Sequence, residues 1–313
     1  MNRKEIFYQD KENCKLPFTH IMDDVSNHSL DVIDELYGAA DVLSILNAQK
    51  YQKILLALAV VGTIITFLFL LYDSIGWYGL ILACGVMICV LFGIYRFSNK
   101  LDCHKKYLEY RVLAESLRVQ YFLSIAGVKK PVVDILPWFI KMDIPFVEEI
   151  LLTLPEVNLN EKRPIIDFWI RDQKEYHKSA LVKSERKINR DNRISRIVLF
   201  ITIISYILAC IFEILVINNF SMTHEYGIRL FLKVILGTMS AITLFSGSYY
   251  GKMSLSNVIC DHRRMISLYE KAENDVLEYG ETEELLLFLA REFLIENSTW
   301  YSYQSKNEPN IVI

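Results

Sequence analysis

The chain has 313 residues, 52% of them hydrophobic, and a formal net charge of −3 at pH 7. This length alone would suit one or two soluble domains, but a mean hydropathy of +0.24 and several long uncharged runs exclude an ordinary soluble protein. The six cysteines are scattered without a C-x-x-C pair, which excludes a disulfide framework and favours a reducing cytoplasm.

The N-terminal region, residues 1–53, is predicted to be cytoplasmic and to contain a helix over residues 24–53. Apolar side chains recur there at spacings of three and four, the pattern of an amphipathic helix. They are Leu30, Ile33, Leu36, Tyr37 and Ala40. We expect this helix to lead into the first membrane span.

Four apolar segments are long enough to cross a membrane. They are residues 54–72, 79–95, 197–217 and 228–247. About 20 residues of helix, at about 1.5 Å each, cross a hydrocarbon core of about 30 Å. The predicted fold is therefore an all-α integral membrane protein with two transmembrane hairpins, 54–97 and 197–247.

The distribution of Lys and Arg predicts the orientation of these spans. Residues 1–53 hold 6 of them, residues 96–196 hold 20 and residues 248–313 hold 6, whereas the two hairpin tips hold none. Because cytoplasmic loops are enriched in Lys and Arg, we expect both termini and the central region to lie in the cytoplasm.

The central cytoplasmic region, residues 98–196, is predicted to contain two helices joined by a linker. The first continues out of span two as His104–Gly127 and stops at its glycine. Residues 128–164 hold five of the seven prolines between apolar pieces, which indicates a compact linker with one short helix at 145–154. A helical pattern returns at 165–196 and runs into span three.

The C-terminal region, residues 248–313, is predicted to be helical on both sides of Gly280. Residues 249–279 extend span four. Residues 281–297 form a last amphipathic helix, with acidic side chains in its first turn, where the helix dipole favours them.

The stretches that follow the two hairpins are similar at a constant offset of 158 residues. The matches are Ser98/Ser256, Asn99/Asn257, His104/His262, Lys105/Arg263, Lys106/Arg264, Leu108/Ile266, Ala114/Ala272 and Glu115/Glu273. Either the hairpins are diverged copies of one unit, or both helices simply leave a membrane with a basic cluster.

No common enzyme motif is present, since the sequence lacks a P-loop, H-E-x-x-H and G-x-S-x-G. Cys103-His104 and Cys260-Asp261-His262 offer ligating atoms, but metal sites need about four converging ligands. Here Lys and Arg lie alongside and repel a cation. We expect no catalysis, no cofactor and no metal site.

Polar and small residues within spans three and four are candidates for a pore or its outer mouth. A carboxylate in hydrocarbon must be paired, hydrated or protonated. Glu213 therefore either pairs with Lys233, at similar depth in span four, or forms a ring of carboxylates at the mouth of an oligomeric pore. Span four also has a face that either packs on a neighbour or lines water. This face holds Gly237, Ser240 and Gly247, with Thr243 and Ser246 beside it.

A basic stripe precedes span three. Its members are Lys183, Arg186, Lys187, Arg190, Arg193 and Arg196. Such a cluster binds either anionic lipid headgroups or a phosphate-containing ligand such as a nucleotide or oligonucleotide. No DNA-binding or RNA-binding motif accompanies it.

The segment "YRVLAESLR" places Arg111, Glu115 and Arg118 on one side of the predicted helix. Charges at this spacing add only a few tenths of a kcal/mol when exposed. Buried between helices, they fix the register of those helices instead. We interpret this helix as a coupling helix that passes a signal into the spans.

The same segment, within "HKKYLEYRVLAESLRVQYF" directly after a two-span hairpin, resembles the signature of the SLATT family of prokaryotic two-transmembrane effector domains. The matching residues are Tyr110, Arg111, Leu113, Ala114, Glu115, Leu117 and Arg118. With "FWIRDQKEYH", a second hairpin and "FLIENSTWY", the resemblance extends over residues 35–301 and is to longer members with four spans.

The resemblance implies a pore-forming effector of a bacterial anti-phage defence system in the bacterial inner membrane. Such proteins usually accompany a nucleotidyltransferase or a nucleotide-sensing domain, and we expect no attached sensor domain in this chain. We therefore expect a homo-oligomeric channel or pore in contact with membrane lipid, gated by a cytoplasmic nucleotide or nucleic-acid signal or by a partner protein. The alternative is a non-conducting scaffold or sensor subunit that recruits a cytoplasmic enzyme.

Overall fold

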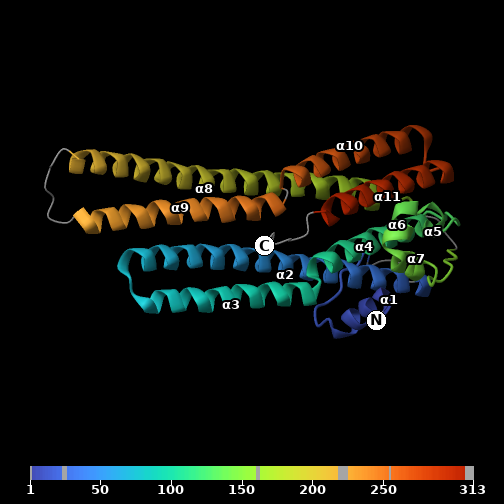
Figure 1. Cartoon of the computed structure of the whole chain (residues 1–313). Coiled ribbons are helices and arrows are strands. Elements are labelled where there is room, and N and C mark those ends of the chain that lie inside the picture. The colour runs from blue at the N-terminus through green and yellow to red at the C-terminus, as the bar shows by residue number, and fades with distance from the viewer. Residues whose placement is uncertain (1, 23–26, 160–162, 218–224, 254, 307–313) are drawn as a thin grey trace. The chain divides into compact units, whose positions relative to one another are not determined.

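The structure, a computed structural model, describes residues 2–22, 27–159, 163–217, 225–253 and 255–306. Within these ranges the chain is helical and contains no strand (Figure 1). It divides into two compact units. Unit 1 comprises Met1–Tyr51, Asp102–Leu181 and Cys260–Ile313, and unit 2 comprises Gln52–Leu101 and Val182–Ile259.

Eleven α-helices and one short π-helical segment, η1, make up the described part of the chain. In order they are α1 (Arg3–Asn13), α2 (His28–Ile75), α3 (Tyr78–Leu101), α4 (Cys103–Ile125), α5 (Val132–Ile135), α6 (Trp138–Asp143), α7 (Pro145–Leu151), η1 (Ile166–Arg171), α8 (Asp172–Ile217), α9 (Glu225–Met253), α10 (Leu255–Tyr279) and α11 (Glu283–Ser305).

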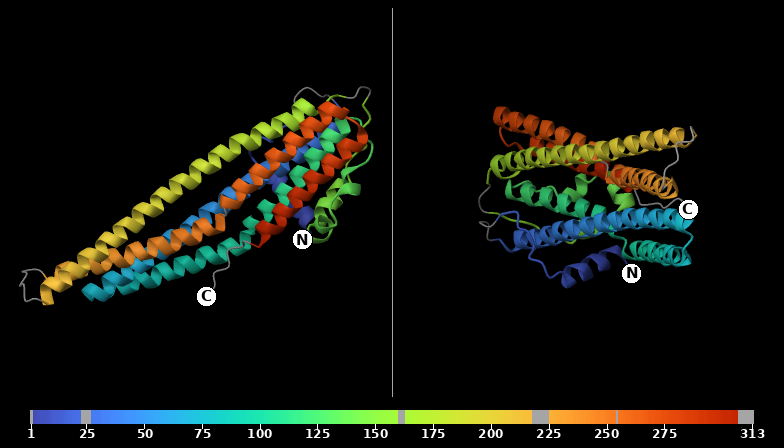
Figure 2. Two further views of the ribbon diagram at one scale, coloured as in Figure 1. Left: turned by 90° about the horizontal axis from the view of Figure 1, so that it is seen from above. Right: turned by 90° about the vertical axis from the view of Figure 1, so that its left-hand side faces the viewer.

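Four helices are long and apolar enough to cross a membrane, as the sequence predicts. They are His28–Ile75, Tyr78–Ile125, Ile166–Val216 and Tyr226–Phe245. Within unit 2, α2 and α3 lie side by side (Figures 1 and 2), and the Cys84 thiol of α3 lies 3.7 Å from the Ile65 carbonyl oxygen of α2. These two helices thus pack on one another.

Unit 1 is built around α4, which contacts α5, α7 and α11. The sequence predicts an α4 with one apolar and one charged side. The structure instead buries most of its residues on both sides and leaves only Lys105 exposed. Trp169 of η1 stacks on Phe122 of α4, with ring centroids 5.3 Å apart. This packing brings the charged residues of α4 into the interior of the unit.

The proline-rich linker contains three short helices rather than the single one predicted. Pro131 and Pro137 precede α5 and α6, and Pro145 is the first residue of α7. Proline suits these positions because its fixed φ matches the start of a helix and its missing N–H is not needed there. Val132, Ile140, Phe146, Val147 and Ile150 bury their side chains in the core, so the linker is part of unit 1.

Two predicted helix stops are confirmed and one predicted continuation is interrupted. Gly127 and Gly280 have φ angles of 75° and 76°, a conformation that glycine adopts without steric cost. Between α3 and α4, where a continuous helix is predicted, Asp102 leaves helical geometry with a φ of 51°. The last helix, α11, extends beyond its predicted end to Ser305.

Candidate functional site

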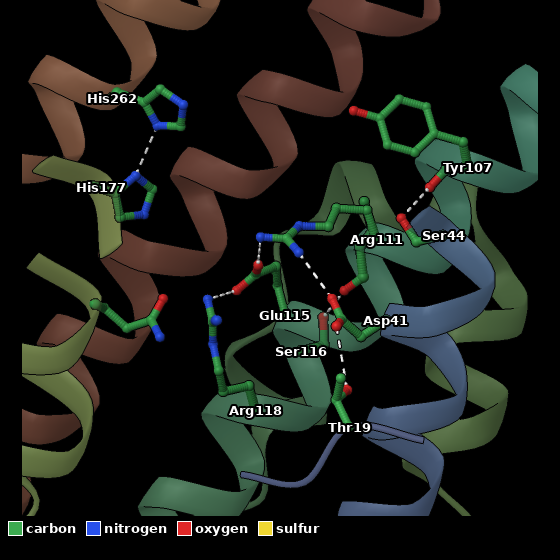
Figure 3. A network of polar contacts seen from close by, with 12 residues as sticks. Thr19, Asp41, Ser44, Tyr107, Arg111, Glu115, Ser116, Arg118, His177 and His262 are labelled. Atoms are coloured by element: carbon green, nitrogen blue, oxygen red, sulfur yellow. Dashed lines mark hydrogen bonds and ion pairs between the residues drawn. The ribbon is translucent and has the colours of Figure 1, made fainter. Parts of the chain in front are cut away.

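The predicted coupling residues of α4 form a charged network inside unit 1 (Figure 3). Arg111 Nη2 lies 2.5 Å from Glu115 Oε1, and Arg118 pairs with the other carboxylate oxygen. Residues three and four apart face one another along a helix, which explains how one carboxylate reaches both arginines. The expected grouping of these three residues is therefore present in the structure.

A fourth charge comes from α2, where Asp41 Oδ1 lies 3.1 Å from Arg111 Nη1. The other Asp41 oxygen accepts a hydrogen bond of 3.3 Å from Thr19 Oγ1. The network therefore joins the segment before α2 with α2 and α4. It contains two carboxylates and two guanidinium groups, so its formal charge is zero.

The network is largely shielded from solvent. The side chains of Arg118, Glu115 and Arg111 are 11%, 17% and 26% exposed. Burial alone would raise the pKa of Glu115, but the two guanidinium groups overcome it and lower the pKa. Burial likewise opposes the charge of Arg118, yet Glu115 raises its pKa. Arg111, Glu115 and Arg118 are thus held in their charged forms.

Two histidines pair beside this network. His177 Nδ1 of α8 lies 3.0 Å from His262 Nδ1 of α10 (Figure 3), so one nitrogen donates and the other accepts. Burial and then the neighbouring His262 lower the pKa of His177 to about 3, although Glu115 opposes the shift. Burial also lowers the pKa of His262. Both rings are therefore neutral near pH 7 and connect α8 to α10.

Buried charges of this kind fix the arrangement of the helices that carry them. Breaking a buried ion pair leaves an uncompensated charge, so the partners hold one arrangement strongly. Of the two alternatives for the α4 charges, the structure favours fixed register between helices over an exposed solubilising face. Among the described residues, no three His, Cys, Asp or Glu side chains converge closely enough to hold a metal ion.

The candidate charges of spans three and four are paired, but not as predicted. Glu213 binds Arg229 through two hydrogen bonds of 3.0 and 2.9 Å, and Lys233 pairs with Asp73 of α2. The expected Glu213–Lys233 pair is therefore wrong in its partners, because Arg229 lies one turn closer to the start of α9. A carboxylate ring at a pore mouth stays a prediction.

The small face of α9 divides into two parts. A Cβ atom on Gly237 would overlap the side chain of Leu70 on α2, so this glycine serves close packing. Ser240, Thr243 and Gly247 are exposed, and the two hydroxyls donate to backbone carbonyls one turn earlier. The side chain of Ser246, also predicted for this face, lies outside the described residues.

The basic stripe of α8 is mostly exposed. Lys183, Arg186, Arg190 and Arg193 are exposed, and Lys187 is half-buried. Arg190 Nε lies 3.5 Å from Asp191. The stripe is therefore oriented to meet anionic groups from outside the unit.

The sequence interpretation missed Asp41 of the charged network and His177 of the histidine pair beside it. Asp41 is a lone acid within the buried run Ala39–Leu43 of α2, and a charge inside an apolar helical face is a signal for a buried partner. His177 carried no such signal, because its partner His262 lies on a distant helix. No protein-family model, curated protein or solved structure matches this chain.

Proposed function

We propose that this protein is a homo-oligomeric channel or pore of a bacterial cell membrane, gated through unit 1. In this proposal α2 with α3, and α8 with α9, are transmembrane hairpins, and both termini are cytoplasmic. The observation that carries it is the continuity of α2 and α8. Each helix begins with residues of the charged network or its histidine pair and ends as an apolar segment long enough to cross a bilayer.

Helix continuity supplies a physical means of control. An α-helix rises about 1.5 Å per residue as a single hydrogen-bonded rod. Asp41 on α2 and His177 on α8 are held by buried polar contacts to neighbouring helices. A ligand or partner that rearranged these contacts would therefore act on two helices that continue into the proposed spans.

Assembly follows from the number of spans. Four helices packed together enclose no aqueous path, so conduction needs several copies around an axis. Large apolar side chains cover the outside of unit 2, including Leu82 at 71%, Val86 at 62% and Phe200 at 64% exposure. Such a surface is stable against lipid and against other copies of the same helices.

The defence role rests on the resemblance to the SLATT family. It implies a trigger made or sensed by another protein, such as a nucleotidyltransferase or its nucleotide or oligonucleotide product. The exposed basic stripe of α8 suits either a phosphate-containing ligand or anionic lipid headgroups, and these two roles are separated by binding measurements with and without lipid.

Electrical recording tests the channel directly. The purified oligomer in a planar bilayer is expected to conduct ions in discrete steps, in the presence of the genomic neighbour's product if it is silent alone. An assembled oligomer that never conducts, with or without that product, would refute the proposal.

Variants of α9 test which face lines the path. Ser240→Val and Thr243→Val remove hydroxyls from the exposed side and are expected to reduce depolarisation of expressing cells. Val86→Thr on the exposed side of α3 is the matched control for a hydroxyl change. Depolarisation unchanged by the α9 variants would contradict this lining.

A charge swap tests the Glu213–Arg229 pair. Reversing one of the two charges leaves two like charges facing one another, so each single variant, Glu213→Arg or Arg229→Glu, is expected to impair folding. The double variant preserves the pair and is expected to retain folding.

A non-conducting scaffold is the second candidate, and one observation favours it. Trp138 and Met142, one turn apart on α6, are 74% and 61% exposed. Trp and Met are enriched in protein interfaces, so this pair suits recruitment of a cytoplasmic enzyme. A scaffold would co-purify with its partner through Trp138 and leave the membrane potential intact.

A further inference from the structure

The junction between α3 and α4 carries unusual backbone geometry. Asp102 is the only non-glycine residue with a positive φ among the described residues. This left-handed conformation is strained for a residue with a side chain, although Asp tolerates it better than most. Such residues persist only where their surroundings hold them.

Nothing in the local sequence requires this interruption. Residues 98–106, "SNKLDCHKK", contain neither glycine nor proline, and α3 and α4 together read as one helix long enough to span a membrane. A contact from elsewhere in the chain holds the side chain of Asp102 at this break.

This contact comes from α1. An aspartate at the start of a helix ordinarily accepts a hydrogen bond from the first turn, but Asp102 makes no such bond. Instead, Arg3 Nη2 of α1 donates to Asp102 Oδ2 at 2.8 Å. The side chain of the strained residue is thus held by the N-terminal helix.

The same helix, α1, also forms hydrogen bonds with the first two turns of α4. Arg3 Nε also donates to Glu109, whose side chain is 4% exposed. Asp10 accepts hydrogen bonds of 2.7 Å from both Lys106 Nζ and Tyr110 Oη. The fully buried ring of Phe7 lies 5.4 Å from that of Tyr110, centroid to centroid.

We propose that α1 is a regulatory clamp over the α3–α4 junction. When docked, it holds Asp102 in the left-handed conformation and covers Glu109. When α1 is released, Asp102 enters the helical region, α3 and α4 join into one helix, and Glu109 regains water. The clamp has two states. Docked α1 selects the left-handed conformation of Asp102, and released α1 selects the helical one.

The consequence for the spans rests on the proposed function. The α4 helix carries the Arg111–Glu115–Arg118 network, and α3 is a proposed span. Joining them makes a rigid connection where a break stood. The clamp itself is testable without any conductance, so its failure and the failure of the channel proposal can be told apart.

Hydrogen exchange on the full-length protein in lipid nanodiscs tests the clamp. The first N–H groups of a helix lack acceptors within it, so the amides of Cys103 and Lys105 gain acceptors in α3 when the helices join. The variants Asp102→Gly and Asp102→Ala both remove the carboxylate and differ in backbone preference. Glycine tolerates the left-handed conformation, whereas alanine favours the helix.

We expect the α1 amides to exchange about tenfold faster in Asp102→Ala than in Asp102→Gly. This factor corresponds to the strain of one left-handed residue with a side chain. The amides of Cys103 and Lys105 should exchange more slowly in the same variant. Arg3→Met should act in the same direction as alanine, and Glu12→Gln, on the exposed side of α1, should leave both regions unchanged.

Two outcomes would overturn the clamp. One is equal α1 exchange in the alanine and glycine variants, with amides near Phe122 still protected as a check on folding. The other is unchanged exchange at Cys103 and Lys105 in Arg3→Met. As a rescue, Asp10→Lys combined with Lys106→Asp should restore α1 protection that each single variant loses. If the exchange pattern is as expected and no conductance appears, the clamp stands and the channel proposal fails.

Discussion

Replacing Glu115 by glutamine tests the central charged network. The change keeps the side-chain shape but removes the negative charge that Arg111 and Arg118 share. Asp41 remains for Arg111, and Arg118 loses the carboxylate that it pairs with. The network then carries one uncompensated positive charge in the interior of unit 1.

The magnitude follows from the burial of the three side chains. Breaking a fully buried ion pair costs about 3–5 kcal/mol. Exposures of 11–26% leave some contact with water, so we expect a loss of about 2–4 kcal/mol in the free energy of unfolding. For a unit of this size that loss lowers the melting temperature by about 5–15 °C.

Thermal unfolding in detergent, followed by tryptophan fluorescence, measures the effect, since Trp169 is buried against Phe122 beside the network. Glu270→Gln on the exposed side of α10 is the matched control, with an expected change within about 0.5 kcal/mol. Arg118→Gln in the Glu115→Gln background should cost less than the sum of the single changes, because both remove one interaction. Equal melting temperatures for Glu115→Gln and its control, or strict additivity, would refute the reasoning.

Three further predictions concern protons and glycines. Burial and His262 hold the pKa of His177 at about 3, below its value of about 6.5 in the unfolded chain. The folded protein therefore binds fewer protons, and its stability is full above about pH 6.5 and falls as the pH drops toward 3. His177→Gln should reduce the fall in melting temperature between about pH 7 and pH 5, and equal slopes would contradict this origin. Gly62→Ala places a methyl group 2.6 Å from a ring carbon of Phe245 and should destabilise unit 2 by about 1–3 kcal/mol. Gly85→Ala meets no atom within 4 Å and should be neutral or stabilising. Unfolding in detergent compares the two variants. Gly280→Ala should lower the melting temperature through a cost of about 1 kcal/mol at its φ of 76°, and an unchanged value would show that this turn relaxes.

The helical elements were largely predictable because their signals are local. Uninterrupted apolar runs, glycine stops and the spacing of charges on α4 are properties of neighbouring residues. Gly127 and Gly280 end helices because their own backbones tolerate positive φ. The three linker helices were less predictable, since each is too short for periodicity to be read.

The charged sites were only partly predictable because their partners come from other helices. Arg111, Glu115 and Arg118 share one helix, so spacing alone groups them. Sequence spacing could not identify Asp41 or His177, which belong to α2 and α8.

By itself, the sequence determined an all-helical chain with four segments apolar enough for a membrane, since hydropathy and helical period are local properties. Tertiary structure decided whether the α4 charges are exposed or buried, and which cation faces Glu213. It also decided the break at Asp102, where the sequence favours a continuous helix. The physical reason is that charge pairing and strain depend on which surfaces meet, and Arg3 reaches Asp102 only once α1 has packed against α4.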